Sequence, residues 1–343
     1  MRRKIFIIVP SLSPTGPVKG AIALANFLIN KREITLISVK NGAGASAVID
    51  KRIKHICLGA ISSSTFGKLR AYKKLLAEAG DKSEVASISM CFSADLINIF
   101  CRKYALICSS VRGNLIKIYK MDYGIIGLPF AVIHLISLMR FDKVIAMSSH
   151  MADQIEYFSR RKSYVVGNFV DEIQLVKYKK NLITDRPKAK RFVFVGSISV
   201  RKQPLLLIKA VKKLHDQGLN IQLDLIGDGP LFADIIAEVR KLKLNEIVRI
   251  YGQLVNPYLL MSKADVFILP SMSEGTSRAS LEALFIGLPC VLRKIDGNSE
   301  LIESGSNGIL FEKDNDLHFA MLDALQLADS QSRLTKLVPE FFR

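Results

Sequence analysis

The chain alternates short apolar runs with segments of helical periodicity along almost its whole length, and this alternation restricts its possible folds more than any other feature. In the first half we expect strands at Lys4–Val9, Ile34–Lys40, Lys54–Leu58, Glu84–Met90, Tyr104–Ser109, Lys143–Met147 and Tyr164–Gly167. In the second half we expect them at Phe192–Val195, Ile221–Ile226, Ile247–Tyr251, Val266–Leu269 and Pro289–Leu292. Strands separated by helices of this length are typical of parallel, doubly wound sheets. The sequence therefore predicts an α/β protein with two Rossmann-like domains.

The alternation breaks near residue 171, where a polar, Lys-rich segment that contains Pro187 begins. We expect a first domain over residues 1–171, a linker over 172–190 and a second domain over 191–343. A chain of 343 residues is long enough for two such domains. Because ligands of open α/β sheets bind at the carboxyl ends of the strands, we expect any ligand in a cleft that the two domains face.

Positive charge is concentrated in the first half of the chain. The formal net charge is +18, and residues 1–171 carry 25 Lys and Arg against 11 Asp and Glu, a net charge of +14. Such an excess suggests an anionic partner, either nucleic acid or the acidic face of a membrane, or else a merely soluble basic protein. The basic residues are not interleaved with aromatic ones and no nucleic-acid-binding motif is present, so we expect no nucleic acid partner.

The segment Tyr123–Met139 contains no Lys, Arg, Asp or Glu. It is shorter than the roughly 20 residues that a spanning helix needs, and it contains Gly124, Gly127 and Pro129. We expect a buried helix. The alternative is a helix that dips into one leaflet of a membrane, flanked by Lys117, Lys120, Arg140 and Lys143.

Cysteine usage and the start of the chain both favour the cytosol. The five cysteines are odd in number and form no CxxC pair, which predicts reduced core residues. The basic residues and short apolar run at the start are explained better by a first strand than by a signal peptide.

Residues 264–312 predict a ligand site. The strand Val266–Leu269 is followed by a loop, Ser271–Gly275, and by a helix that runs from Thr276 to Ile286. The carboxylates of Glu274 and Glu282 lie on either side of the helix start, with seven residues between them. The free N–H groups and the positive end of such a helix attract anions. A second loop with a glycine, Asp296–Glu300, follows the next strand.

The run EGTSRASLEALFIGLPCVL…DGNSELI resembles the donor-binding segment of the GT4-type retaining glycosyltransferases, whose signature is two Glu separated by seven residues. FVGSISVRKQP, LIGDGPL, YGQLVNPYLLMSKADVFILPS, VIAMSSHMADQI and VVGNFVD also resemble segments of that family, in the same order. The resemblance covers nearly the whole chain and implies the GT-B fold, with a nucleotide-sugar as the donor. It also implies that no metal or further cofactor is required.

The resemblance assigns roles to individual residues. Lys202 stands at the position of the phosphate-binding lysine, Glu274 would contact the hydroxyls of the donor sugar, and Glu282 would contact the ribose. The alternative for Lys202 is a solvated surface lysine, for Glu274 a helix-capping carboxylate, and for Glu282 a solvated residue on the helix face. We predict that Glu274, Lys202 and Arg112 are catalytic. The predicted donor-binding residues are Gly16, Gly196, Ser197, Arg201, Lys202, Glu274, Gly275, Thr276, Ser277, Arg278 and Glu282.

The sequence departs from the family at two places. Ser197 occupies a position where the family has an arginine of the diphosphate site, and we expect Arg201 or Arg278 to replace that charge. The segment Ser110–Asn114 resembles a Ser-x-Arg-x-Asn variant of bacterial polysaccharide and lipid-linked oligosaccharide transferases. Its Arg112 would neutralise a phosphate of donor or acceptor, or else lie at the surface or a domain interface. Gly16 would let the backbone approach the donor phosphates, or else form an ordinary turn.

Metal binding is not predicted. The five histidines are scattered, and Asp314-Asn315-Asp316, although it fits a D-x-D metal motif, is expected to form a turn with a helix N-cap.

The expected protein is a metal-independent, retaining glycosyltransferase that moves a sugar from UDP-hexose or UDP-N-acetylhexosamine onto a lipid-linked saccharide. We expect it at the cytoplasmic face of an anionic membrane, in O-antigen or capsule synthesis. The rival hypotheses are a GT-B-fold UDP-sugar epimerase and a basic nucleic-acid-binding protein.

Overall fold

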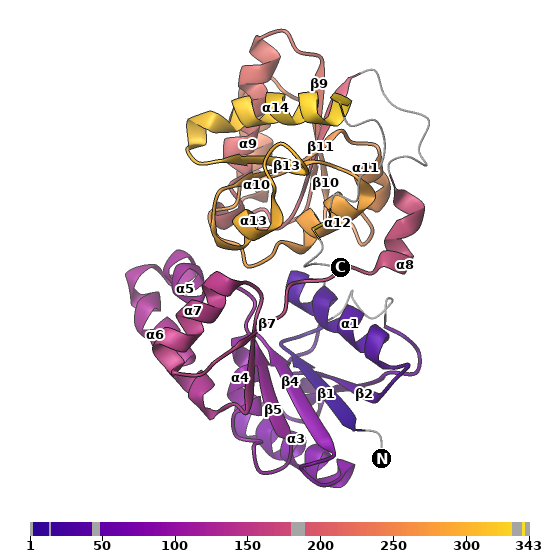
Figure 1. Ribbon diagram of the computed structural model, residues 1–343, viewed down its shortest axis with the longest axis vertical. Coiled ribbons are helices and arrows are strands. Elements are labelled where there is room, and N and C mark those ends of the chain that lie inside the picture. Colours follow the sequence, from indigo (N-terminus) through magenta and orange to yellow (C-terminus); the bar gives the residue numbers. More distant parts are fainter. Residues whose placement is uncertain (1–2, 14, 43–48, 180–188, 331–337, 340–343) are drawn as a thin grey trace. The chain divides into compact units, whose positions relative to one another are not determined.

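The computed structural model describes residues 3–13, 15–42, 49–179, 189–330 and 338–339. The chain folds into two compact units, residues 1–167 and 168–343, and each is described here by itself (Figure 1). The first eight residues of the predicted linker contain α8 (Glu172–Leu175) and η4 (Val176–Tyr178), and residues 180–188 of that linker lie outside the described part of the chain.

The first unit is built on a sheet of seven parallel strands in the order β3-β2-β1-β4-β5-β6-β7. Its strands are β1 (Lys4–Val9), β2 (Glu33–Ser38), β3 (Lys54–Cys57), β4 (Val85–Met90), β5 (Leu106–Ser110), β6 (Lys143–Ala146) and β7 (Tyr164–Val165). Its helices are α1 (Gly16–Leu28), α2 (Leu58–Ile61), α3 (Thr65–Ala79), α4 (Phe92–Asn98), α5 (Leu115–Tyr123), η2 (Gly124–Ile126), α6 (Gly127–Ser137), η3 (Leu138–Arg140) and α7 (Ser149–Ser159).

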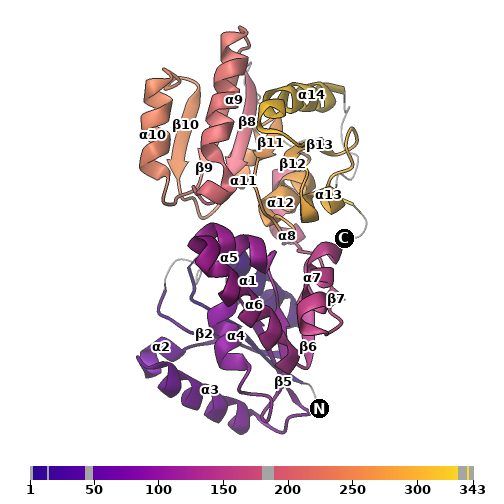
Figure 2. The ribbon, with the colours of Figure 1, turned by 90° about the vertical axis from the view of Figure 1, so that its left-hand side faces the viewer.

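Helices cover both faces of this sheet, which explains why its strands are almost continuously apolar. On one face α1 packs against Ile7 and Val9 of β1. On the other face, α3, α4, α6 and α7 enclose a second core that includes Phe6 and Ile8 (Figure 2). Successive residues of β1 therefore point into two different cores, as the period of a strand requires.

The predicted buried helix over Tyr123–Met139 is wrong. Gly124, at a φ of 65°, ends α5, and the chain continues through η2 into α6. A Cβ on Gly127 would lie 2.1 Å from the carbonyl oxygen of Tyr119, so α6 packs closely on the backbone of α5. By length and composition alone, Leu115–Arg140 is long and apolar enough to cross a membrane. Only 28% of its most apolar window is buried, so it is not a core helix.

The second unit is built on six parallel strands in the order β10-β9-β8-β11-β12-β13. They are β8 (Lys190–Val195), β9 (Ile221–Ile226), β10 (Val248–Gly252), β11 (Val266–Leu269), β12 (Cys290–Arg293) and β13 (Gly308–Phe311). Its other helices are η6 (Val200–Lys202), α9 (Pro204–Asp216), α10 (Phe232–Lys241), α11 (Tyr258–Ser262), α12 (Arg278–Ile286), α13 (Asp296–Leu301), η7 (Asp314–Asp316) and α14 (Leu317–Ser330).

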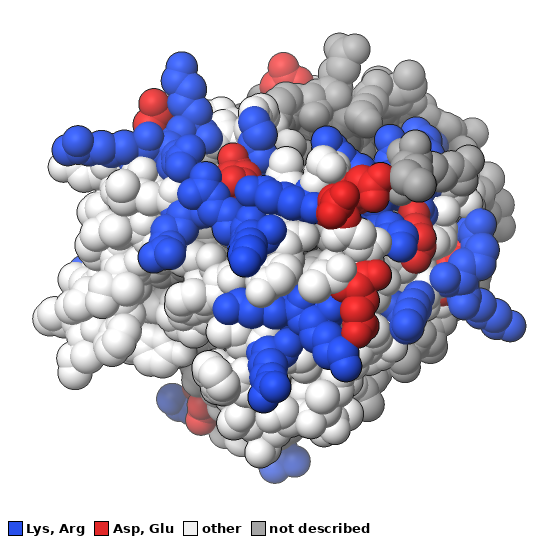
Figure 3. Space-filling model, turned by 90° about the horizontal axis from the view of Figure 1, so that it is seen from below, with Lys and Arg blue, Asp and Glu red and all other residues white. Residues whose placement is uncertain are grey.

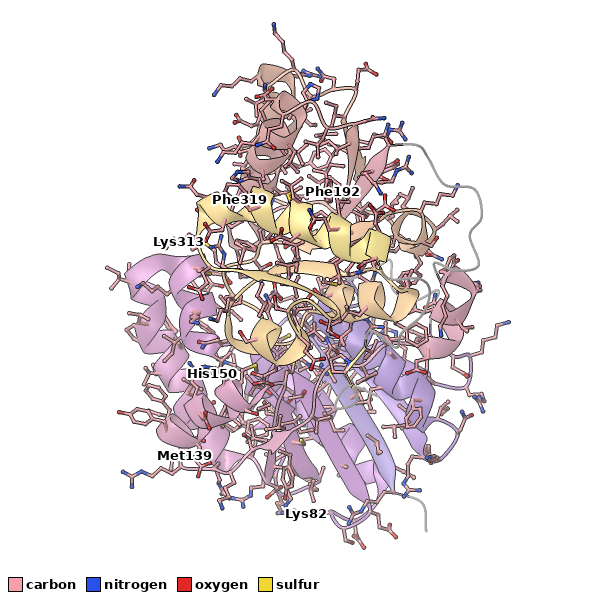
Figure 4. The ribbon with its side chains drawn as sticks, turned by 45° about the horizontal axis from the view of Figure 1, so that its top comes forward. Lys82, Met139, His150, Phe192, Lys313 and Phe319 are labelled. Atoms are coloured by element: carbon pink, nitrogen blue, oxygen red, sulfur yellow. The ribbon has the colours of Figure 1, made fainter. Side chains whose placement is uncertain are left out.

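One core runs through the second unit; β11 is completely buried in it, and β8 is buried except at its two end residues. Phe192 of β8 lies inside it, whereas Phe319 on α14 is 58% exposed (Figure 4). The prediction of two doubly wound parallel sheets is confirmed, although β13 was not predicted. The helix expected after Asp316 is α14. The strand order reverses between β8 and β11, so that the helices after these two strands lie on opposite faces of the sheet.

The cysteines agree in part with the prediction of reduced core residues. All five are free thiols in the described chain; Cys101, Cys108 and Cys290 are buried, and Cys57 and Cys91 are half-buried.

Candidate active site

The site begins where the strand order of the second unit reverses. Because β8 and β11 are parallel neighbours, the loops that follow them leave the same edge of the sheet side by side. The β8 loop leads to Lys202, and the β11 loop carries Glu274. The backbone N–H of Met272 donates to the carbonyl oxygen of Arg201 at 2.9 Å and ties the two loops together.

Lys202 and Glu274 form a buried ion pair at this position. The Lys202 Nζ lies 2.5 Å from Glu274 Oε1, and their side chains are 12% and 9% exposed. Burial alone would raise the pKa of Glu274, but the charges of Lys202 and Arg201 outweigh it and lower that pKa. Glu274 is therefore ionised at neutral pH, and it compensates the cost of burying the Lys202 ammonium. The alternative interpretation of Lys202 as a solvated surface lysine is wrong.

Arg201 joins the same carboxylate. Its Nη1 donates to the carbonyl oxygen of Ser273 at 2.9 Å and lies 3.4 Å from Glu274 Oε1. Its side chain is 28% exposed, so it has more access to solvent than Lys202. The site thus contains two cations and one carboxylate, a net positive charge that suits an anionic ligand.

Glu282 lies on α12 and has its own partners. Arg278 Nε donates to Glu282 Oε1 at 2.9 Å, and the Tyr258 hydroxyl donates to the same oxygen at 3.1 Å. Glu282 is 6% exposed, so the alternative of a solvated helix residue is wrong. Burial, followed by the nearby charge of Glu282, raises the pKa of Tyr258 and keeps its hydroxyl protonated as a donor.

The start of α12 is ordered by its neighbours. Ser277 is the N-cap, and its hydroxyl oxygen accepts the N–H of Ser280 at 3.3 Å. Asn168 Nδ2 donates to the carbonyl oxygen of Thr276 at 3.2 Å. A Cβ on Gly297 would lie 1.4 Å from the carbonyl oxygen of Gly275, so only glycine lets α13 approach this loop. The predicted helix ends as expected at Gly287, whose φ is 100°.

Gly196 and Ser197 lie in the β8 loop, beside the loop that follows β9. The N–H of Gly196 donates to the carbonyl oxygen of Ile226 at 3.0 Å. Gly227, at a φ of 148°, packs so closely that a Cβ on it would lie 1.8 Å from the carbonyl oxygen of Gly196. Ser197 is exposed, and its hydroxyl lies 3.2 Å from that of Ser199.

Gly16 and Arg112 belong to the first unit, and the cluster described above belongs to the second. Gly16 is the first residue of α1, and a Cβ on it would meet no heavy atom within 4 Å. Arg112 is half-buried and follows β5, with its Nη2 3.1 Å from the sulfur of Met90.

The described residues contain no group of three or more His, Cys, Asp or Glu side chains that could hold a metal ion. Asp314–Asp316 forms η7, and Asp316 Oδ2 accepts the N–H of Lys313 at 3.1 Å. The carboxylate of Asp314 lies 2.6 Å from Arg293 Nη2. The prediction of a capped turn is confirmed.

Three site residues were not predicted: Asn168, Tyr258 and Gly297. Each lies within a segment that carries the family resemblance, but nothing in its own sequence context indicates its partner. Gly297 follows a strand and opens a helix, which is the one local signal of close backbone approach.

Residues 178–337 match the model of the family described as Glycosyl transferases group 1. The chain carries a group 1 glycosyltransferase domain. This domain includes Lys202, Glu274 and Glu282, the charged residues described above.

Two curated relatives match longer stretches of the chain than the 160 residues of this domain. An Escherichia coli UDP-Gal:α-D-GlcNAc-diphosphoundecaprenol α-1,3-galactosyltransferase is 27% identical over 181 residues, 52% of this chain and 47% of the relative. A Campylobacter jejuni N-acetylgalactosamine-N,N'-diacetylbacillosaminyl-diphospho-undecaprenol 4-α-N-acetylgalactosaminyltransferase is 26% identical over 254 residues, 71% of this chain and 67% of the relative. The chain thus spans about half the length of the first relative and two thirds of the second.

The fold is also that of solved glycosyltransferases. A crystal structure of Anabaena HepE in complex with UDP and glucose superimposes with a TM-score of 0.78 at 18% identity, covering 98% of this chain and 93% of that one. The GT-B fold, two parallel-sheet α/β domains, is therefore the fold of this chain.

Proposed function

We propose that this chain is a retaining glycosyltransferase that transfers a hexose or N-acetylhexosamine from its UDP-sugar. The observation that carries this proposal is the cluster of Lys202, Arg201 and Glu274 at the strand-order reversal of a group 1 domain. A cluster with two cations and one carboxylate matches a sugar diphosphate, which offers anionic oxygens beside neutral hydroxyls.

The diphosphate, the sugar and the ribose of the donor would each contact a different part of this site. The diphosphate would compete with Glu274 for Lys202 and would also face the N–H groups at the start of α12, from Gly275 to Arg278. Glu274, relieved of that partner, would accept hydrogen bonds from the sugar hydroxyls. Glu282, held by Arg278 and Tyr258, would accept from the ribose hydroxyls.

Transfer would break the bond between the anomeric carbon and the diphosphate oxygen while an acceptor hydroxyl forms the new bond on the same face. The hydroxyl proton would pass to the departing diphosphate. Lys202 and the positive end of α12 would stabilise the charge that develops on that leaving group. These groups supply the role that a metal ion has in other transferases, so the proposed reaction is metal-independent.

The position of Arg201 explains how the site would tolerate Ser197. Arg201 lies within 3.4 Å of the carboxylate that also binds Lys202, so its charge is already in the diphosphate site. Arg278 is instead committed to Glu282, with its side chain only 10% exposed. Of the two predicted replacements, we therefore favour Arg201.

The proposed acceptor is a saccharide linked to a lipid diphosphate, at the cytoplasmic face of the membrane, in synthesis of an O-antigen or capsule. Both relatives reported above act on saccharides linked to diphosphoundecaprenol. The net charge of +14 in residues 1–171 suits an anionic acceptor and an anionic lipid surface. Arg112 would bind a phosphate of the acceptor or donor, and Gly16 would allow phosphate approach to α1.

The two rival functions have less support. Both reported relatives are transferases, which gives no support to an epimerase. Nucleic acid binding would explain the charge alone, without explaining the buried ion pairs of the second unit.

The test is a transfer assay with four donors, chosen from UDP-hexoses and UDP-N-acetylhexosamines. The acceptor is a saccharide linked through a diphosphate to a short polyprenol, and EDTA is present. We expect one donor to give a product with retained anomeric configuration by NMR. Epimerised donor in the absence of acceptor would contradict transfer, and an inverted product would contradict the retaining mechanism. Loss of activity with EDTA would contradict metal independence, and transfer only to soluble acceptors would contradict the lipid-linked acceptor.

A further inference from the structure

An apolar surface covers the outer side of α5, η2 and α6 in the first unit. The exposed fractions of its six main side chains are 65% for Tyr123, 78% for Ile125, 75% for Ile126, 54% for Phe130, 60% for Ile133 and 46% for Ile136. We call these six the α5–α6 surface. Together they expose on the order of several hundred Å² of apolar area, the size at which a patch indicates an interaction site.

The inner side of the same helices is firmly attached to the unit. Ala131, His134 and Leu135 of α6 are buried. His134 Nε2 lies 3.0 Å from Asp95 Oδ2 of α4, and the Tyr119 hydroxyl lies 3.3 Å from His134 Nδ1. The ring of Phe92 packs edge-on against His134 at 4.8 Å. These contacts fix the helices in place, so the α5–α6 surface is preformed and does not depend on a mobile segment.

Basic side chains border this surface. Lys120 lies in the last turn of α5 and Arg140 ends η3, which follows α6, and both are exposed. The same stretch contains two acidic residues, Asp122 and Asp142. Asp142 is already paired with Arg102 at 2.9 Å. Seen from below, an area without charged side chains lies beside a cluster of Lys and Arg (Figure 3). Met139, which follows α6, lies at the outer edge of the first unit (Figure 4).

This combination matches the interface of an anionic lipid bilayer. Apolar side chains enter the acyl region, a tyrosine suits the boundary, and Lys and Arg at the rim contact the anionic headgroups. A second copy of the chain would bring the same basic rims together, and their repulsion opposes such a pairing.

The same helices are too short to cross a bilayer. At 1.5 Å a residue, the nine residues of α5 and the eleven of α6 reach about 14 and 17 Å, against a hydrocarbon core of about 30 Å. Gly124 and the close packing at Gly127 turn one helix back onto the other, so the two lengths do not add.

We propose that the α5–α6 surface inserts into one leaflet of an anionic membrane and anchors the first unit there. The apolar face would enter to a depth of about 5–10 Å, with the basic rim at the headgroups. This proposal deepens the proposed function, because it places the enzyme on the surface that holds a lipid-linked acceptor.

Vesicle flotation tests it with the full chain, using phosphatidylcholine vesicles with and without phosphatidylglycerol. The test variant carries Ile125→Glu and Ile126→Glu. A matched control carries Phe27→Glu and Phe319→Glu, at side chains that are 63% and 58% exposed and lie on α1 and α14, so the net charge changes equally. We expect the wild type and the control to float with anionic vesicles and the test variant to lose at least roughly tenfold in partitioning.

A second variant separates charge from insertion. Lys120→Glu with Arg140→Glu should reduce partitioning into anionic vesicles by about fivefold a residue and leave the weaker binding to neutral vesicles unchanged. The thermal unfolding and UDP affinity of each variant identify any that misfold. A wild type that does not float, or a folded Ile125→Glu/Ile126→Glu variant that floats as well as the control, would overturn the proposal. A dimer that the same variant disrupts, in a protein that binds no vesicles, would assign the surface to a second copy instead.

The proposed function can fail independently. Vesicle binding without sugar transfer would leave this surface assigned and refute the transferase, whereas transfer to a detergent-dispersed acceptor without vesicle binding would do the reverse.

Discussion

Glu274 is the residue on which the charge balance of the site depends, because one of its oxygens faces both Lys202 and Arg201. Its place before Glu282, with seven residues between the two, was enough to predict that it binds a ligand. Its ion pairs could not be predicted, because they form between loops that are 72 residues apart in sequence. The same holds for Tyr258, whose hydroxyl reaches Glu282 only once α11 and α12 pack together.

The replacement of the missing arginine is a prediction about Arg201. Arg201→Ala should raise the donor KM about tenfold, since a charged hydrogen bond to phosphate is worth roughly 1.5–3 kcal/mol. Arg278→Ala, which leaves Glu282 without its cation, should lower the melting temperature more than it changes the KM. Steady-state kinetics with varied donor and thermal unfolding measure both effects.

A second substitution tests the same role of Arg201 by rescue. Ser197→Arg restores the arginine of the family and should recover a large part of the donor affinity that Arg201→Ala loses. An unchanged KM in Arg201→Ala, or no recovery in the double variant, would show that the charge of Arg201 does not serve the diphosphate.

Glu274→Gln should show a distinctive pH dependence of stability. The pKa of Glu274 is lowered from its ordinary 4.5 in the folded chain, so its contribution is complete above pH 4.5 and disappears as the pH falls through the lower folded value. Removing the carboxylate leaves Lys202 buried without its partner, which should cost roughly 3 kcal/mol at pH 7. The stability difference from wild type should therefore shrink as the pH falls below 4.5.

Thermal unfolding from pH 7 to pH 3.5 measures this difference. Glu312→Gln is the matched control, because Glu312 also pairs with a lysine, Lys294, but at the surface. It should change the melting temperature little at any pH. A difference for Glu274→Gln that is independent of pH would contradict the assignment of an ionised, paired carboxylate.

Among the elements, strands were predicted more accurately than the apolar helices. Val266–Leu269 and Ile221–Ile226 were predicted to the residue. The first is an unbroken apolar run that ends at Pro270, and the second alternates apolar and polar residues before it ends at Gly227. The error at Tyr123–Met139 has a physical cause. Composition reports that a helix is apolar, but not whether protein covers it, and a helix with apolar residues on every side has no period to indicate its inner face. Its buried His134 faces Asp95, and only the fold brings those two residues together.

The approach of α13 to the β11 loop yields a prediction at the scale of elements. Gly297→Ala would place a Cβ 1.4 Å from the carbonyl oxygen of Gly275 and force the two elements apart. We expect a loss of about 1–3 kcal/mol in stability together with weaker UDP binding, because the displaced loop carries Glu274. Gly16→Ala, also in the first turn of a helix, is the control for stability, since its Cβ meets no atom within 4 Å. Equal melting temperatures for the two variants would contradict the close packing.

At the scale of the whole molecule, the two-sheet architecture could be predicted because the alternation of strands and helices is repeated in each half. The positions of the charges could be counted but not placed on a surface. Chain order does not indicate that the basic residues around Lys120 and Arg140 border an exposed apolar face, because that depends on the turn at Gly124.

Nucleotide binding gives the last prediction, because it separates the roles of the two units. The cluster of Lys202, Arg201 and Glu274 lies wholly in the second unit, so UDP should stabilise that unit by mass action, by about 2.7 kcal/mol at a hundred times its dissociation constant. A thermal-shift titration of UDP, GDP and ADP should therefore raise the unfolding temperature most for UDP. Lys202→Ala should remove most of the shift. Arg112→Ala decides between the two roles of that arginine, since a full UDP shift in this variant assigns Arg112 to the acceptor phosphate and a reduced shift assigns it to the donor. A wild type that UDP does not stabilise would refute the donor site itself.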